Sequence, residues 1–289
     1  MTNPQSVDLV LRPRERDLGE FTVRRVLPAA RRRAIGPFVF FDHMGPAVFP
    51  PGKGIAVRPH PHIGIATITY LFEGQIMHRD SLGVTQAIEA GAVNLMTAGR
   101  GIVHSERAGD DLDATSSLHG IQSWIALPND KEEIEPAFEH IPASELPEFE
   151  QGGCTIRVIM GECLGRKSPV PTYSETLYLD VVMQVEGTLA LPDEWAEFAV
   201  YVVEGSVMID GEHYESGAMA IAGGNSALAI TANADSRVMV IGGDSVGERH
   251  IYWNFVHSSE ARIEQAKDDW REGRFEMVPG DGEFIPLPD

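Results

Sequence analysis

Short apolar runs that alternate with glycine and proline turns are the feature that most restricts how this 289-residue chain can fold. Residues 65–72 are rich in β-branched and aromatic side chains and lead into Glu73-Gly74, a turn signal. Similar runs cover 87–96 and 121–127, and seven more follow between 155 and 241. Many short strands joined by such turns predict an all-β sandwich or barrel.

The β pattern occurs twice. Residues 70–74 (YLFEG) resemble residues 201–205 (YVVEG), and residues 90–93 (AGAV) resemble residues 216–219 (SGAM). Between the two copies, residues 128–151 alternate prolines with glutamates, which predicts an extended surface connection. We therefore expect a first domain at 1–127, an acidic, proline-rich linker at 128–151 and a second domain at 152–289.

One helix is expected inside the second domain, near residues 259–272. Ile263, Ala266 and Trp270 recur at helical spacing. A pair of serines precedes the run and Gly273 follows it, so both ends carry cap signals. This pattern is typical of a helix that packs against a core.

The charge is uneven and acidic. Lys plus Arg number 23 and Asp plus Glu number 43, for a net charge of −20, and residues 128–289 carry the whole excess. An acidic chain is not expected to bind nucleic acid directly, and a protein partner for the acidic half is possible. No stretch approaches the roughly 20 apolar residues of a membrane-spanning helix, so no membrane insertion is expected. Two cysteines and a start without a secretory pattern predict a cytoplasmic protein.

Three histidines and one glutamate form a candidate metal site. His60 and His62 precede one strand, and His104 and Glu106 follow a glycine-rich turn. Residues i and i+2 of a strand share a face, so each pair offers two ligands on one side. Each pair alone is typical of a protein surface, but both together favour one divalent ion with open positions. Fe(II) is expected, and Ni, Mn, Cu, Co and Zn remain open.

The same residues lie in motifs that resemble the pirin family, two-domain members of the cupin superfamily. The motifs are 58–62 (RPHPH), 69–74 (TYLFEG), 78–81 (HRDS) and 96–106 (MTAGRGIVHSE), and 40–46 and 251–275 are also similar. The resemblance implies two tandem cupin barrels of the double-stranded β-helix or jelly-roll type with a C-terminal helix. It also implies iron in the first barrel, with His60, His62, His104 and Glu106 as ligands.

The chain departs from the common cupin pattern in two places. Ala66 and Thr67 stand where many cupins have a glutamate after the histidine pair, and Glu106 is expected to supply the carboxylate instead. In the second copy, Leu191 and Asp193 stand opposite His60 and His62. The second barrel is therefore expected to lack metal ligands.

Four further residues are candidates for the substrate pocket: Phe40, Asp42, His43 and Met96. Exposed loop positions or core packing are the plainer interpretations of the same residues. His78 and His119 are interpreted as ordinary histidines.

The resemblance implies a quercetin 2,3-dioxygenase-type oxidoreductase that acts with O2 on a flavonol such as quercetin or a related enolisable aromatic. Glu106 would be the catalytic general base. The alternative is a non-catalytic protein whose iron state regulates a transcription factor or a metabolic enzyme. A degenerate protein with a purely structural metal is the third possibility.

Overall fold

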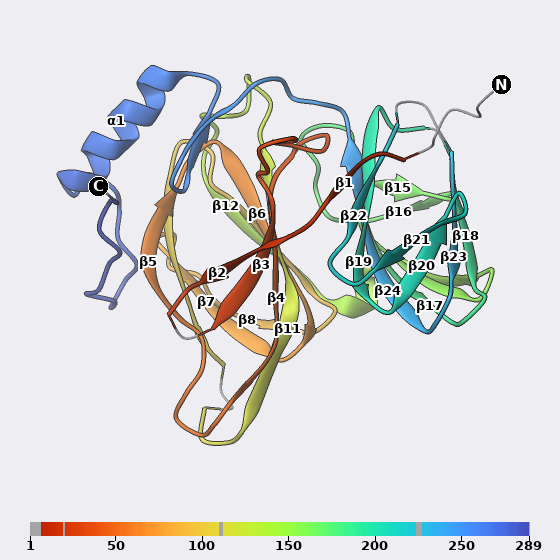
Figure 1. Ribbon diagram of the computed structural model, residues 1–289. Coiled ribbons are helices and arrows are strands. Elements are labelled where there is room, and N and C mark those ends of the chain that lie inside the picture. The colour runs from red at the N-terminus through yellow and green to blue at the C-terminus, as the bar shows by residue number, and fades with distance from the viewer. Residues whose placement is uncertain (1–6, 20, 110–111, 193, 224–226, 289) are drawn as a thin grey trace. The chain divides into compact units, whose positions relative to one another are not determined.

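The computed structural model describes residues 7–19, 21–109, 112–192, 194–223 and 227–288 (Figure 1). Within these residues the regular structure is almost entirely β-strand. The exceptions are a single α-helix, α1 (Glu260–Arg271), and one short 3-10 turn (Ala143–Glu145). The all-β class and the C-terminal helix predicted from the sequence are confirmed.

The first barrel consists of two facing sheets. Its seven-stranded sheet has the order β12 (Ala137–Ile141), β9 (Val93–Thr97), β6 (Ile65–Glu73), β11 (Ser116–Ala126), β4 (Phe38–Phe49), β3 (Thr22–Leu27), β2 (Arg14–Asp17). Its four-stranded sheet has the order β5 (Ala56–His62), β10 (Ile102–Ala108), β7 (Gln75–Asp80), β8 (Thr85–Glu89). The chain alternates between the sheets, as in a jelly roll.

The second barrel repeats this plan. Its seven-stranded sheet has the order β1 (Val7–Leu11), β22 (Met219–Ala222), β19 (Glu197–Glu204), β24 (Ser236–Gly243), β17 (Thr176–Met183), β14 (Cys154–Met160), β13 (Glu148–Gln151). Its four-stranded sheet has the order β18 (Thr188–Leu191), β23 (Leu228–Ala232), β20 (Ser206–Ile209), β21 (Glu212–Glu215). Two small hairpins complete the structure: β15 (Glu162–Cys163) with β16 (Arg166–Lys167), and β25 (His250–Tyr252) with β26 (Phe255–His257).

The internal repeat in the sequence reflects this shared topology. The motif at 70–74 ends β6, and its counterpart at 201–205 ends β19. Both strands occupy the same position between neighbours, because β9-β6-β11-β4 corresponds to β22-β19-β24-β17. A tandem pair of barrels is thus the observed architecture.

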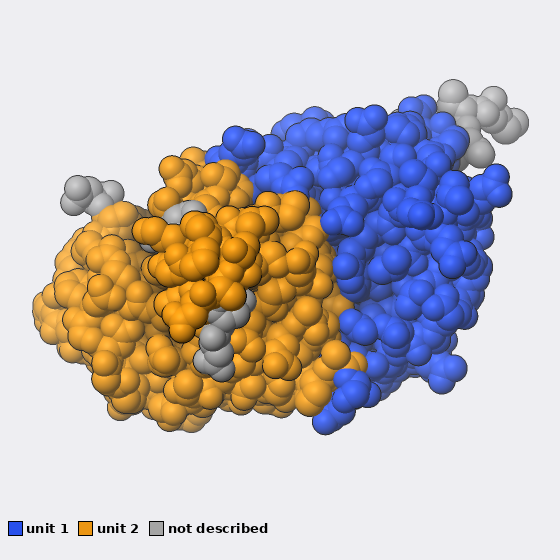
Figure 2. All heavy atoms as spheres, turned by 90° about the horizontal axis from the view of Figure 1, so that it is seen from below, with its two compact units in different colours: residues 1–15, 24–41, 144–245 blue, residues 16–23, 42–143, 246–289 orange. Residues whose placement is uncertain are grey.

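The compact units differ from the predicted domain boundaries. One unit contains residues 1–15, 24–41 and 144–245, with the second barrel, and the other contains 16–23, 42–143 and 246–289, with most of the first barrel (Figure 2). Strand β1 pairs with β22 of the second barrel, whereas α1 belongs to the unit of the first barrel. The start of the chain therefore belongs to the unit of the second barrel, and its end belongs to the unit of the first barrel. The order of the sequence predicted the opposite assignment.

Two paired strands lie within the segment 128–151. Strand β12 pairs with β9 of the first barrel, and β13 pairs with β14 of the second. Its prolines flank these strands, since Pro136 precedes β12, Pro142 follows it and Pro147 precedes β13. Proline at a strand end leaves the ladder hydrogen bonds intact, which is why the segment can pair despite its composition.

Helix α1 packs on the first barrel next to the β5–β6 turn. Ile263, Ala266 and Trp270 form its buried face, in one cluster with Ile63 and Phe255. The indole Nε1 of Trp270 donates a hydrogen bond to the carbonyl of Ile285 at 3.0 Å. Among the described residues, no helix is both long enough and apolar enough to cross a membrane.

The chain after α1 is also fixed to the strand that carries the histidine pair. The amide of Ile285 donates to the carbonyl of Pro59 at 2.8 Å, and Ile63 forms a bridge with Phe255 of β26. The C-terminal segment thus contacts β5 and the turn that follows it.

We predict that Trp270→Ala destabilises the first-barrel unit by about 3–5 kcal/mol, because it removes a buried aromatic side chain and leaves a cavity. Urea unfolding would measure the decrease in the free energy of unfolding. Hydrogen exchange would show which residues are destabilised. Met277→Ala is the control, since Met277 is 39% exposed and exposed positions usually change stability by less than about 0.5 kcal/mol. Equal effects of the two substitutions would contradict a packing role for α1.

Candidate metal centre

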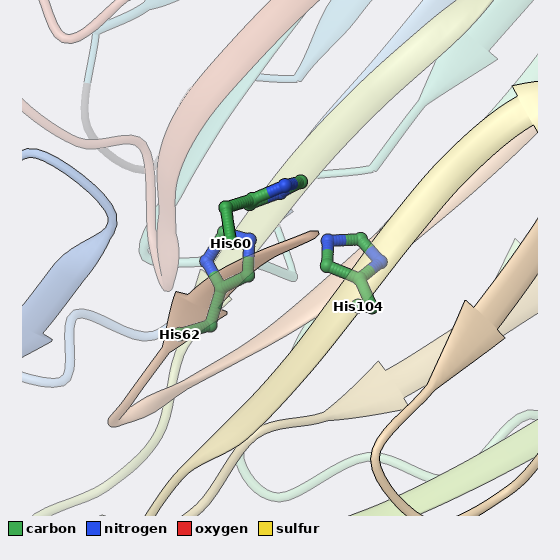
Figure 3. Close-up of side chains that lie close together, drawn as sticks. All are labelled: His60, His62 and His104. Atoms are coloured by element: carbon green, nitrogen blue, oxygen red, sulfur yellow. The ribbon is translucent and has the colours of Figure 1, made fainter. Parts of the chain in front are cut away.

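Three buried histidines converge inside the first barrel. Strands β5 and β10 pair so that His104 lies opposite His60, and Ile102 lies opposite His62. Because paired residues and residues i, i+2 share a face, all three imidazoles point to the same side. One nitrogen from each lies within 4.8 Å of the others, and the rings gather at one point (Figure 3).

The turn after His62 depends on glycine. Gly64 has a φ of +68°, a left-handed conformation that side chains with a Cβ rarely adopt. A Cβ at this position would lie 2.0 Å from the carbonyl oxygen of Val256. The chain can therefore reverse from β5 into β6 directly after the histidine pair and still lie against β26.

Hydrogen bonds define which nitrogens face the centre. His60 Nδ1 lies 2.9 Å from the carbonyl oxygen of Arg58, and a carbonyl can only accept, so Nδ1 carries the proton and Nε2 keeps its lone pair. His62 Nδ1 and His104 Nε2 are buried and have no hydrogen-bond partner in the protein. Unpaired buried nitrogens are costly unless a ligand takes them, and three converging imidazole lone pairs suit a divalent metal ion. The residues present therefore fit the metal that the sequence implies.

Burial keeps the metal-free histidines neutral. Loss of solvation lowers the pKa of His60 to about 4, against a smaller rise from its bond to the Arg58 backbone. The same desolvation, with repulsion from neighbouring imidazoles, holds the pKa values of His62 and His104 well below the usual range. Neutral imidazole is the metal-binding form, so the site is ready for an ion throughout the physiological pH range.

Glu106 lies beside the histidines but outside the group that shares the 4.8 Å limit. It follows His104 by two residues in β10, so both side chains share a face. The pairing with β5 shifts between His104 and Glu106, so that Glu106 lies opposite Val57. Desolvation raises the pKa of Glu106 to about 7. Its role as the fourth ligand stays a prediction.

A row of side chains on the seven-stranded sheet faces the histidines. Phe138, Met96, Thr67 and Trp124 lie side by side across β12, β9, β6 and β11. Trp124 packs edge-on against His62 with ring centroids 5.1 Å apart, and at the other end Phe138 stacks on His78 at 4.4 Å. Thr67 occupies one of the two positions where many cupins have a glutamate, so the wall is less acidic here.

Of the four residues predicted to line the pocket, one lies in the row that faces the histidines and three lie in β4. Met96 lies in the row that faces the histidines. Asp42 and His43 are buried in β4, where His43 Nε2 lies 2.8 Å from Nε2 of His119 and the two rings stack. Phe40 lies in the part of β4 that belongs to the other compact unit, under the guanidinium of Arg25 at 4.5 Å. A pocket role for these residues stays a prediction.

Sequence reasoning missed several residues around the centre. His78 was interpreted as an ordinary histidine, but its Nδ1 lies 3.3 Å from Nδ1 of His104. It belongs to β7, the neighbour of β10. Trp124 and Phe138 come from distant strands and gave no local signal. His78 and Asp80 alternate in the same way in β7, and this spacing could have suggested a polar face, as it did for the other two pairs. In the second barrel, Leu191 is buried in the apolar core, and Asp193 lies outside the described residues.

The chain is similar to proteins of one family along most of its length. Residues 20–125 match the family model described as Pirin, and residues 178–276 match the Pirin C-terminal cupin domain. A pirin-like protein of Caulobacter vibrioides is 49% identical over 98% of this chain and 100% of that protein. A Pseudomonas aeruginosa protein with the provisional name quercetin 2,3-dioxygenase is 41% identical over 88% of this chain and 80% of its own.

The fold is also similar to a solved structure. A crystal structure of a quercetin 2,3-dioxygenase from Acinetobacter baumannii superimposes with a TM-score of 0.90 at 34% sequence identity. The match covers 97% of this chain and 95% of that one.

We predict that Glu106→Gln stabilises the metal-free protein relative to wild type as the pH rises. The folded-state pKa of Glu106, about 7, lies above its usual value of 4.5, so the wild type loses stability as the pH rises from about 4.5 through about 7, and the loss levels off above that. The variant should gain about 3 kcal/mol relative to wild type between pH 4.5 and about pH 8.5. Urea unfolding in chelator at both pH values measures this. Glu139→Gln, at an exposed carboxyl, is the control, and a gain no larger than the control's would contradict the raised pKa.

Proposed function

The chain belongs to the pirin family, and we propose that its first barrel is a metal-dependent dioxygenase that acts on a flavonol such as quercetin. The observation that carries the proposal is the group of three buried, neutral imidazoles, two of which, His62 and His104, have a buried nitrogen without a protein partner. The names of two relatives, at 41% and 34% identity, support quercetin or a related enolisable aromatic as the substrate.

His60, His62, His104 and Glu106 are the residues that would hold the ion. Three imidazoles and one carboxylate suit Fe(II), which we propose, and Ni, Mn, Cu, Co and Zn accept the same donors. When bound, such an ion supplies positive charge that stabilises an enolate.

The chain's own residues would handle the proton and the ring of the substrate. Glu106 would accept the proton of the enolic hydroxyl, because its carboxyl shares a face of β10 with His104, and burial raises the pKa of this carboxyl in the metal-free protein to about 7. In the row that faces the histidines, Trp124, Met96 and Phe138 would offer aromatic and thioether surface to a flat substrate. A cytoplasmic location and a protein partner for the acidic half stay predictions from the sequence.

We predict chelator-sensitive loss of quercetin absorbance by the purified protein under O2, with about one metal ion per chain by elemental analysis. Glu106→Gln at saturating metal should lower turnover by roughly 10²–10⁴-fold, as expected for loss of a general base. Glu139→Gln is the matched control and should keep full turnover. Metal-loaded protein without turnover across a panel of flavonols would refute the enzyme and favour the iron-dependent binding protein.

We also predict that metal binding releases a proton in a pH-dependent manner. At pH 6 the metal-free Glu106 is mostly protonated and the histidines are neutral, so the wild type should release close to one proton, and at pH 8.5 almost none. Calorimetric titration with Co(II) in two buffers of different ionisation enthalpy measures the number. Glu106→Gln should abolish the release at pH 6. Release of a proton by that variant would show that Glu106 is not its source.

A further inference from the structure

We propose that Asp80 and His78 form a hydrogen-bonded relay that holds the proton of His104 on Nδ1 and so presents Nε2 to the metal. Both are positioning residues, because they act through His104 and not on the substrate. The inference deepens the proposed function, on which its metal role rests.

Strand register brings the three residues together. Strand β7 lies on the other side of β10 from β5, with Asp80 opposite His104 and His78 opposite Glu106. Paired residues share a face, so Asp80 and His78 point to the side of the metal centre. All three relay residues are buried, at 0% exposure for Asp80, 3% for His78 and 2% for His104.

The carboxylate of Asp80 is fixed at both oxygens. Its Oδ1 accepts hydrogen bonds from the backbone amides of Leu82 at 2.9 Å and Val84 at 3.1 Å, in the turn after β7. Its Oδ2 lies 3.0 Å from Nε2 of His78. A carboxylate has only acceptors, so His78 Nε2 must donate.

With His78 in its neutral form, this bond determines the remaining protons. A neutral imidazole with its proton on Nε2 has an acceptor at Nδ1. His78 Nδ1 lies 3.3 Å from His104 Nδ1, so His104 must donate from Nδ1 and keep its lone pair on Nε2. His104 Nε2 is the buried nitrogen that has no protein partner. His60 reaches the same tautomer by a simpler route, through the Arg58 carbonyl.

Asp80→Asn tests the relay with little change in shape. The amide oxygen should keep the two backbone bonds at the Oδ1 position, which forces the NH₂ group toward His78 Nε2. His78 Nε2 must then accept, His78 Nδ1 must donate and His104 must carry its proton on Nε2. The same substitution reverses the histidine tautomer in the Ser-His-Asp triad.

The first readout is the ring nitrogen NMR spectrum of the metal-free full chain with ¹⁵N-labelled histidine at pH 8, with His104 assigned from His104→Gln. We expect an Nδ1-protonated His104 in wild type and an Nε2-protonated His104 in Asp80→Asn. The second readout is Co(II) affinity, which should fall by about 10–100-fold in Asp80→Asn, as for other partners of metal-binding histidines.

Asp180→Asn is the control, because Asp180 is a buried aspartate of the second barrel that is held by Arg237. It should change neither readout.

Three results would overturn the relay: Nε2-protonated His104 in wild type, an unchanged tautomer in Asp80→Asn, or unchanged Co(II) affinity in that variant. If the variant does not fold, the wild-type spectrum alone tests the relay, because Nε2-protonated His104 would contradict it. If the wild type shows the expected tautomer but binds no Co(II), the proton arrangement stands and the proposed function fails.

Discussion

The antiparallel register between β5 and β10 is the constraint on which the candidate centre depends. Side chains alternate between the faces of a strand, so a slip of one residue would turn His60 and His62 away from His104. The same face of β10 also meets β7, which brings the Asp80–His78 pair behind His104. One strand therefore places a candidate ligand toward the centre and connects it to the residues that orient it.

Burial of these side chains shifts their pKa values and so sets their protonation states. Imidazoles in water would be partly protonated near pH 6, whereas the desolvated histidines stay neutral and keep lone pairs for an ion. The same lack of solvent raises the pKa of Glu106, because a carboxylate is costly in an apolar interior. One physical cause thus keeps the histidines neutral and raises the pKa of the glutamate in the metal-free protein.

Local patterns in the sequence were sufficient for the fold class and the histidine group, because strand alternation places His60 with His62 and the glycine turns mark the strands. These local patterns could not predict which strands pair when the strands are distant in the sequence. His78 contacts His104 through the register of β7 with β10, and Trp124 meets His62 from β11. The domain boundaries differed for the same reason, since the partners of β1 and α1 are distant in the sequence. The prolines of 128–151 flank strands, which composition alone does not reveal.

The contacts between the C-terminal segment and β5 have a consequence for the order of events during synthesis. Pro59, His62 and Ile63 are each held by residues beyond position 250, through Ile285, the Asn254 backbone and Phe255. On a ribosome His60 and His62 emerge nearly two hundred residues before the segment that braces them. A nascent chain therefore displays His60 and His62 without their supports, which are complete only when translation has passed α1 and reached Ile285.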